Sequence, residues 1–151
     1  SEARCKAAMI RVIGLGSPFG DDRVGWRVIE LLEGRLPQKI DLVALDRPGA
    51  ALINWMQEID HLILVDAVSS GATPGTLIKI YPAQLDTSGG RLTSHDLALS
   101  ATLRLAASLG CLPARTNIYG VEIGGHTEEG LSTVAEAAAA ELASVIVDAV
   151  S

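Results

Sequence analysis

The segment that most constrains the fold is residues 13–25, Ile-Gly-Leu-Gly-Ser-Pro-Phe-Gly-Asp-Asp-Arg-Val-Gly. It begins as an aliphatic run, breaks into glycines, and ends on two adjacent acids before an apolar periodic stretch. This pattern predicts a buried strand that turns sharply into a helix, which is the building unit of parallel α/β sheets. Helix N-termini attract anions, so such a turn usually cradles a phosphate. The carboxylates of Asp21 and Asp22 favour a cation there instead.

The rest of the chain continues this alternation of aliphatic runs and helical periods. We expect strands at residues 10–15, 41–45, 61–67, 76–81 and 116–121, and helices at residues 23–35, 50–59, 94–109 and 131–150. The connection before the fourth strand is too short for a crossover helix, so that strand is expected to be antiparallel. The sequence therefore predicts an α/β fold, a three-layer αβα sandwich with a mostly parallel sheet.

The composition predicts one soluble domain and excludes several classes of partner. We assign residues 10–151 to a single domain and residues 1–9 to an N-terminal extension. The net charge of −6 and the aromatic content of 3% argue against nucleic acid and anionic membranes as partners. The two cysteines have no metal-binding spacing, and no apolar run approaches the length of a membrane span. We expect a cytoplasmic protein.

Candidate site residues follow the predicted strands. In open α/β sheets, ligands bind beyond the carboxyl ends of the strands, where the strand order reverses. Asp21 and Asp22 follow the first strand, and Asp66 ends the third. His95 opens the helix after the second long loop and can reach the same crevice. Two carboxylates and one imidazole make a divalent metal site that suits nickel, zinc, copper or iron.

Each of these residues also has an ordinary structural interpretation. Asp22 can complement the N-terminal end of a helix dipole, which is worth about 0.3–1 kcal/mol. Asp66 can accept hydrogen bonds from loop amides, and His95 can be a surface histidine at a helix start. Only their placement on one rim of the sheet favours a shared site.

A dinucleotide-binding module is the alternative to a metal site. Gly14, Gly16 and Gly20 are one residue off the standard fingerprint, and Asp46 follows the second strand, where a ribose-binding acid is expected. The two acids at the phosphate position argue against such a small-molecule or dinucleotide-binding module.

Several segments together resemble a known family, the hydrogenase maturation endopeptidases. Residues 13–17 and 21–25 are similar to the family's opening signature, a glycine turn followed by an acidic pair and a glycine. Residues 64–67 (Leu-Val-Asp-Ala) resemble its central strand end, and residues 94–97 (Ser-His-Asp-Leu) its histidine helix start. Residues 120–122 (Gly-Val-Glu) resemble its last strand and exit loop. These segments occur in the family's order along nearly the whole chain.

The resemblance implies a five-stranded sheet between helix layers and a specific activity. It implies a hydrolase, an aspartic-type endopeptidase that removes the C-terminal extension from the immature large subunit of a nickel–iron hydrogenase after nickel insertion. By position, it places the metal ligands and catalytic groups at Asp22, Asp66 and His95. Asp21 remains an alternative to Asp22, and Asp46 is a second candidate that orients the substrate tail. Nickel is supplied largely by the substrate, and zinc or cadmium can serve as surrogates.

Two departures from the family pattern concern the rim of the site. The family commonly has Asp-Gly-Gly-Thr-x-Gly after the second strand, whereas residues 46–49 here read Asp-Arg-Pro-Gly. The residue after the acidic pair is often Gly or Ala in the family and is Arg23 here. We therefore expect the target preference to differ.

Overall fold

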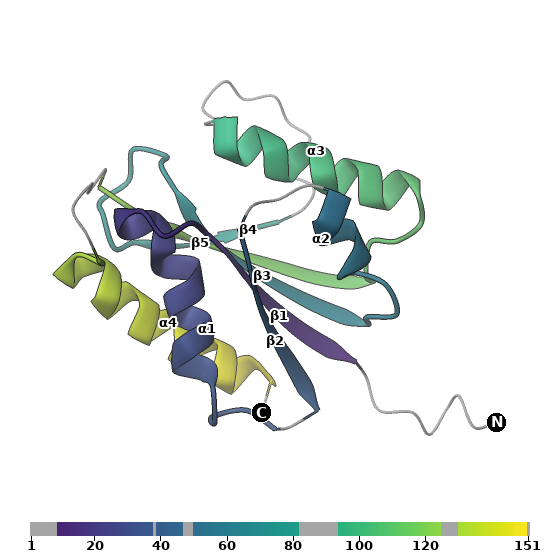
Figure 1. Cartoon of the computed structure of the whole chain (residues 1–151), viewed down its shortest axis with the longest axis horizontal. Coiled ribbons are helices and arrows are strands. Elements are labelled where there is room, and N and C mark those ends of the chain that lie inside the picture. The colour runs from purple at the N-terminus through teal and green to yellow at the C-terminus, as the bar shows by residue number, and fades with distance from the viewer. Residues whose placement is uncertain (1–8, 38, 47–49, 82–93, 125–129, 151) are drawn as a thin grey trace.

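A five-stranded sheet runs through the centre of the molecule in the order β2-β1-β3-β5-β4 (Figure 1). The structure is a computed structural model that describes residues 9–37, 39–46, 50–81, 94–124 and 130–150. All neighbouring strands pair in parallel except β4, which pairs antiparallel to β5. The five predicted strands and the antiparallel pairing of the fourth are thus confirmed. The strands are β1 (Ile10–Leu15), β2 (Ile40–Leu45), β3 (His61–Val68), β4 (Leu77–Ile80) and β5 (Arg115–Glu122).

Helices cover both faces of this sheet, which confirms the three-layer architecture. Figure 1 shows α1 and α4 on one face and α2 and α3 on the other. A 3₁₀ helix, η2, leads directly into α1. The helices are η2 (Gly20–Arg23), α1 (Val24–Leu32), α2 (Ala50–Asn54), α3 (Ser94–Ser108) and α4 (Thr133–Val150).

Two helices end earlier than the sequence predicts. α1 stops at Leu32, because the following turn is closed by a hydrogen bond from the Arg35 N–H to the Leu32 carbonyl, with Gly34 at a φ of 78°. The predicted helix at residues 50–59 ends at Asn54 and continues as turns. Glu58 there has a φ of 60°, a left-handed conformation that no α-helix accommodates.

The central strand β3 is buried along its whole length, as its aliphatic run predicts. Ile63 and Val65 belong to the hydrophobic core beneath α1 and α4. Leu62 and Leu64 belong to the core beneath α2 and α3. Since side chains alternate along a strand, Asp66 lies on the α2–α3 side of the sheet.

Glycines allow α1 to lie directly against β1. A side chain on Gly25 of α1 would collide with the carbonyl oxygen of Leu15, and one on Gly14 of β1 with that of Gly25. This close approach fixes the start of α1, and with it the η2 turn, against the end of β1.

The start of the described chain is hydrogen bonded to the fold. Met9 is the first described residue, and its N–H donates to the Asp60 carboxylate at 2.8 Å. Met9 is the last residue of the predicted extension, residues 1–9, and residues 1–8 lie outside the described residues. In the part of the chain that the structure describes, no helix combines the length and apolarity that crossing a membrane requires.

Candidate active site

The strand order reverses between β1 and β3, as the sequence predicts. These strands are parallel neighbours, with Val65 paired to Gly14 near their carboxyl ends. From this edge the chain continues from β1 through η2 and α1 to β2, while β3 leads to the opposite half of the sheet. Figure 1 shows that α1, α3 and α4 all begin at this end of the molecule. It is therefore the position where an open α/β sheet binds ligands.

Asp66 lies at this edge and is 1% exposed. It follows Val65, which pairs with Gly14 of β1, and it pairs with Gly120 of β5. A buried carboxylate at the end of a central strand is costly unless it is stabilised by hydrogen bonds, a counter-ion or a metal. Its burial therefore marks it as a functional candidate.

His95 is the second residue of α3, which covers the same side of the sheet as Asp66. α3 leads into β5, a strand parallel to β3, so the start of α3 lies at the carboxyl edge. The backbone thus brings His95 to the same edge and the same side as Asp66. The side chain of His95 lies outside what the structure describes.

Asp22 lies within η2, directly beyond β1, and is half-buried. Its N–H donates to the Phe19 carbonyl at 3.1 Å, and its carbonyl accepts from the Ser17 N–H at 3.2 Å. A side chain at Gly16 would stand 2.7 Å from that carbonyl oxygen, so only glycine permits this turn. η2 also contacts β3. The glycine turn therefore holds Asp22 beside the strand that carries Asp66.

Asp21 differs sharply from its neighbour, since it is 3% exposed. Its carboxylate accepts two hydrogen bonds of 2.7 Å from Ser132, one from the backbone N–H and one from the hydroxyl. Ser132 directly precedes α4, 111 residues along the chain. Asp21 thus joins η2 to the start of α4.

The first two amides of the glycine turn are already hydrogen bonded within the fold, unlike those of a phosphate cradle. The Gly16 N–H donates to the Leu45 carbonyl at 3.1 Å, and the Ser17 N–H to the Asp22 carbonyl.

Asp46 is exposed after β2, which β1 separates from β3. The remaining rim residues that depart from the family pattern, 47–49, lie outside the described residues.

Glu122, which the sequence pattern did not mark as a buried acid, is 2% exposed at the end of β5. Its carboxylate accepts hydrogen bonds from the Ser70 N–H at 3.0 Å and from the Ser70 hydroxyl at 2.5 Å. Ile118, four residues earlier on β5, packs in the α2–α3 core, so the alternation places Glu122 on the Asp66 side. An acid that ends a buried strand was the signal that could have identified it.

The described residues do not by themselves form a metal site. Among the side chains that the structure describes, no three of His, Cys, Asp or Glu are placed to hold an ion. The predicted set includes His95, whose side chain is outside that part. Asp22 and Asp66 supply hard oxygen donors, and an imidazole would make the set suitable for nickel or zinc.

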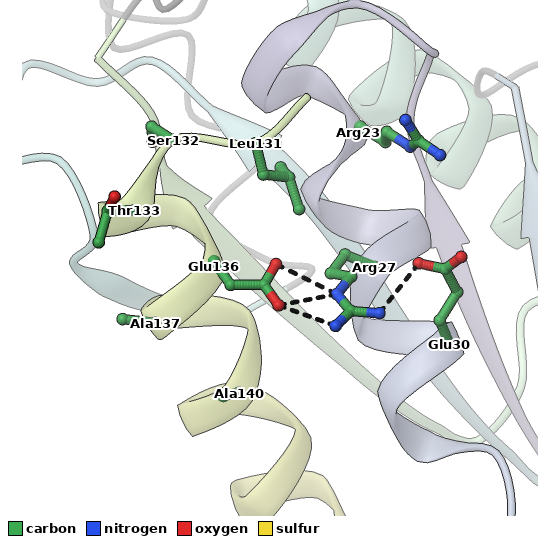
Figure 2. A pocket seen from close by; sticks show the side chains of 9 residues that line it. All are labelled: Arg23, Arg27, Glu30, Leu131, Ser132, Thr133, Glu136, Ala137 and Ala140. Atoms are coloured by element: carbon green, nitrogen blue, oxygen red, sulfur yellow. Dashed lines mark hydrogen bonds and ion pairs between the residues drawn. The ribbon is translucent and has the colours of Figure 1, made fainter. Parts of the chain in front are cut away.

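A groove of about 690 Å³ lies on the other side of the sheet, between α1 and α4 (Figure 2). Arg27 crosses it and makes a bidentate pair with Glu136, with a shortest distance of 2.8 Å, and a longer contact with Glu30. The hydrogen bonds to Glu136 raise the pKa of Arg27 above its ordinary value. Exposed Arg23 lines the same groove. The groove is separated by the sheet from Asp66 and the start of α3.

Several hydrogenase maturation and expression/formation proteins are similar to this chain in sequence. A family model described as hydrogenase maturation protease (HycI) matches residues 26–149, a range that contains Asp66 and His95 and begins after the acidic pair. The hydrogenase 2 maturation protease of Escherichia coli K12 is 30% identical over 117 residues, which are 74% of this chain and 71% of that protein. The hydrogenase expression/formation protein HupM of Azotobacter chroococcum is 31% identical over 118 residues. That alignment covers 75% of this chain and 56% of HupM, so the chain matches little more than half of this relative.

The fold is shared with a solved structure of the same kind. The hydrogenase maturating endopeptidase HybD from E. coli superposes with a TM-score of 0.77 at 29% identity, covering 93% of this chain and 90% of that one. The family match extends over most of the chain, and the sequence and structural similarities agree with it. The chain therefore belongs to the hydrogenase maturation protease family.

Proposed function

We propose that this protein is a cytoplasmic endopeptidase that removes the C-terminal extension from the immature large subunit of a nickel–iron hydrogenase after nickel has been inserted. The observation that carries the proposal is the buried carboxylate of Asp66 at the carboxyl edge of β3, beside η2 and on the side covered by α3. Family membership supports the reaction class, and the position of Asp66 supports the site.

In this proposal, Asp22, Asp66 and His95 contact the nickel that the substrate carries. The metal serves as a template that positions the scissile bond beside these residues. The site is completed by ligands from the large subunit, so the protein alone binds free nickel, zinc or cadmium weakly. A precursor without nickel lacks the cation that would offset the repulsion between the carboxylates of Asp22 and Asp66.

The environments of the two acids support Asp22 rather than Asp21 as the metal-binding residue. Both oxygens of Asp21 already accept hydrogen bonds from Ser132. Asp22 is half-buried on the turn next to β3. The Asp21 carboxylate is already held in its orientation toward Ser132, whereas no hydrogen bond within the described part of the chain ties the Asp22 carboxylate to α4 in this way.

Asp46 is proposed to orient the substrate tail. It is exposed at the carboxyl end of β2, one strand beyond β1, where a peptide that enters the crevice would pass. Arg47 adds a positive charge beside it in the sequence. This pair is where we expect the choice of hydrogenase to be made.

The proposal is tested with two forms of a purified precursor large subunit, one loaded with nickel and one without. We expect the nickel-loaded form to lose its C-terminal extension on incubation with this protein, and the nickel-free form to remain intact, as read by mass spectrometry. Equal cleavage of both forms would contradict nickel recognition, and cleavage of neither would contradict the activity. Equilibrium dialysis with NAD tests the dinucleotide alternative, which requires saturable NAD binding.

A further inference from the structure

We propose that Asp21 and Ser132 form a clasp that positions Asp22 for metal contact, so that the two adjacent acids have separate functions. Asp21 is a positioning residue, and Ser132, 111 residues later in the sequence, is its hydrogen-bonding partner. The inference rests on the proposed function, because it assigns a role to the residue next to the proposed ligand.

Ser132 contributes both its backbone N–H and its hydroxyl to the clasp. Its N–H donates to Oδ1 of Asp21 and its hydroxyl to Oδ2, both at 2.7 Å. The same hydroxyl oxygen accepts the Ala135 N–H at 3.2 Å, which makes Ser132 the N-cap of α4. One serine thus caps the helix and fixes the orientation of the Asp21 carboxylate.

A carboxylate suits this position better than an amide. It faces the N-terminal end of α4, an 18-residue helix whose dipole favours a negative charge there. Both of its oxygens act as acceptors, whereas an asparagine would turn one NH₂ group toward the serine. The charge of Asp21 is therefore satisfied within the fold and is not needed at the metal.

The position of Asp22 follows from that of Asp21 through the backbone of η2. The Asp21 carbonyl accepts the Val24 N–H, and the Asp22 carbonyl accepts the Ser17 N–H. With the Asp21 side chain directed toward α4, the neighbouring Asp22 side chain must leave the turn in another direction. The clasp therefore selects which of the two acids is presented to the ligand edge.

A second contact also involves α4 but joins it to α1 rather than to η2. Glu136 lies one helical turn beyond Ser132 and pairs with Arg27 in the middle of α1, as Figure 2 shows. This pair is partly exposed to solvent, whereas Asp21 is buried. Loss of the pair should loosen the contact of α1 with α4 while leaving the turn in place. Glu136→Gln is thus a matched control on the same helix face.

The test compares Asp21→Asn, Ser132→Ala, Ser132→Thr and Glu136→Gln in the full chain. Amide hydrogen exchange is followed at Ser17, Asp22 and Val24, and the kinetics of precursor cleavage are measured alongside. We expect Asp21→Asn and Ser132→Ala to exchange about tenfold faster at these amides, as the loss of a hydrogen bond to a charged group implies. Their kcat should fall about tenfold with KM unchanged, as for other residues that orient a metal ligand.

Ser132→Thr keeps the hydroxyl, so its amide exchange rates and its kcat should match those of the wild type. Glu136→Gln should change neither the exchange rates nor kcat. Unchanged exchange in Asp21→Asn would overturn the clasp, since that variant leaves the serine cap of α4 intact. Faster exchange with an unchanged kcat would overturn the positioning role. If the wild-type protein cleaves no precursor, the proposed function fails, while the exchange rates still decide whether the clasp holds η2.

Discussion

The carboxylate of Glu122 at the end of β5 is hydrogen bonded to both the backbone N–H and the hydroxyl of Ser70, just beyond the end of β3. The two residues join the exits of neighbouring parallel strands at the edge where Asp66 lies. The loop after β3 is therefore anchored from the strand beside it.

Glu122→Gln should destabilise the protein by about 1–3 kcal/mol, because the amide replaces one buried acceptor with a donor that faces the donors of Ser70. Ser70→Ala is the matched change on the other partner. It removes only the hydroxyl bond and should cost about 1 kcal/mol. Urea unfolding followed by circular dichroism measures both values. A Glu122→Gln cost no larger than that of Ser70→Ala would contradict the anchoring role.

Gly25→Ala should destabilise the protein by about 3 kcal/mol, since the added methyl group would overlap the Leu15 carbonyl and force α1 away from β1. Gly34→Ala provides the comparison, because its position is open but has a φ of 78°. That change should cost about 1 kcal/mol, from backbone strain alone. Thermal unfolding of both variants tests the difference, and equal costs would argue against close packing of α1 on β1.

The elements of the sheet are readable from the sequence because each is determined locally. Residues 61–67 contain an aliphatic run that is typical of a strand covered on both faces, and the short connection before β4 predicts its antiparallel pairing. The early end of α2 is harder to predict, because neither a proline nor a glycine marks it and the left-handed residue of the turn is Glu58. Local pattern therefore predicts the layers better than the helix ends.

The different environments of Asp21 and Asp22 could not be predicted from the sequence. Asp21 and Asp22 are chemically identical neighbours, and the partner that distinguishes them is 111 residues away. The pairing of Arg27 with Glu136 spans 109 residues in the same way. Only the folded arrangement of α4 against η2 and α1 brings these groups together.

Glu136→Gln should lower stability by less than about 1 kcal/mol, because its pair with Arg27 is partly exposed to solvent. The difference from the wild type should shrink in 1 M salt, where charges at the surface are screened. Unfolding curves at low and high salt measure this. A cost that stays the same in both salts would show that packing, rather than charge, holds α1 to α4.

Asp46→Asn should raise the KM for the precursor several-fold and leave kcat nearly unchanged, because a residue that orients the substrate tail contributes to binding before and during the reaction alike. Steady-state cleavage at several precursor concentrations separates the two constants. A loss of kcat at unchanged KM would instead place Asp46 among the groups that act in the chemical step.

We propose that Asp66 acts in the hydrolysis of a nickel-loaded precursor. The most direct measurement is the single-turnover cleavage rate of that precursor by Asp66→Asn, read as loss of the C-terminal extension by mass spectrometry. Asp41→Asn, an equivalent change at an exposed residue that pairs with Arg11, is the control. We expect Asp66→Asn to lose at least about 100-fold in rate while remaining folded, and Asp41→Asn to match the wild type. A folded Asp66→Asn variant that cleaves at the wild-type rate would contradict the assignment of the active site.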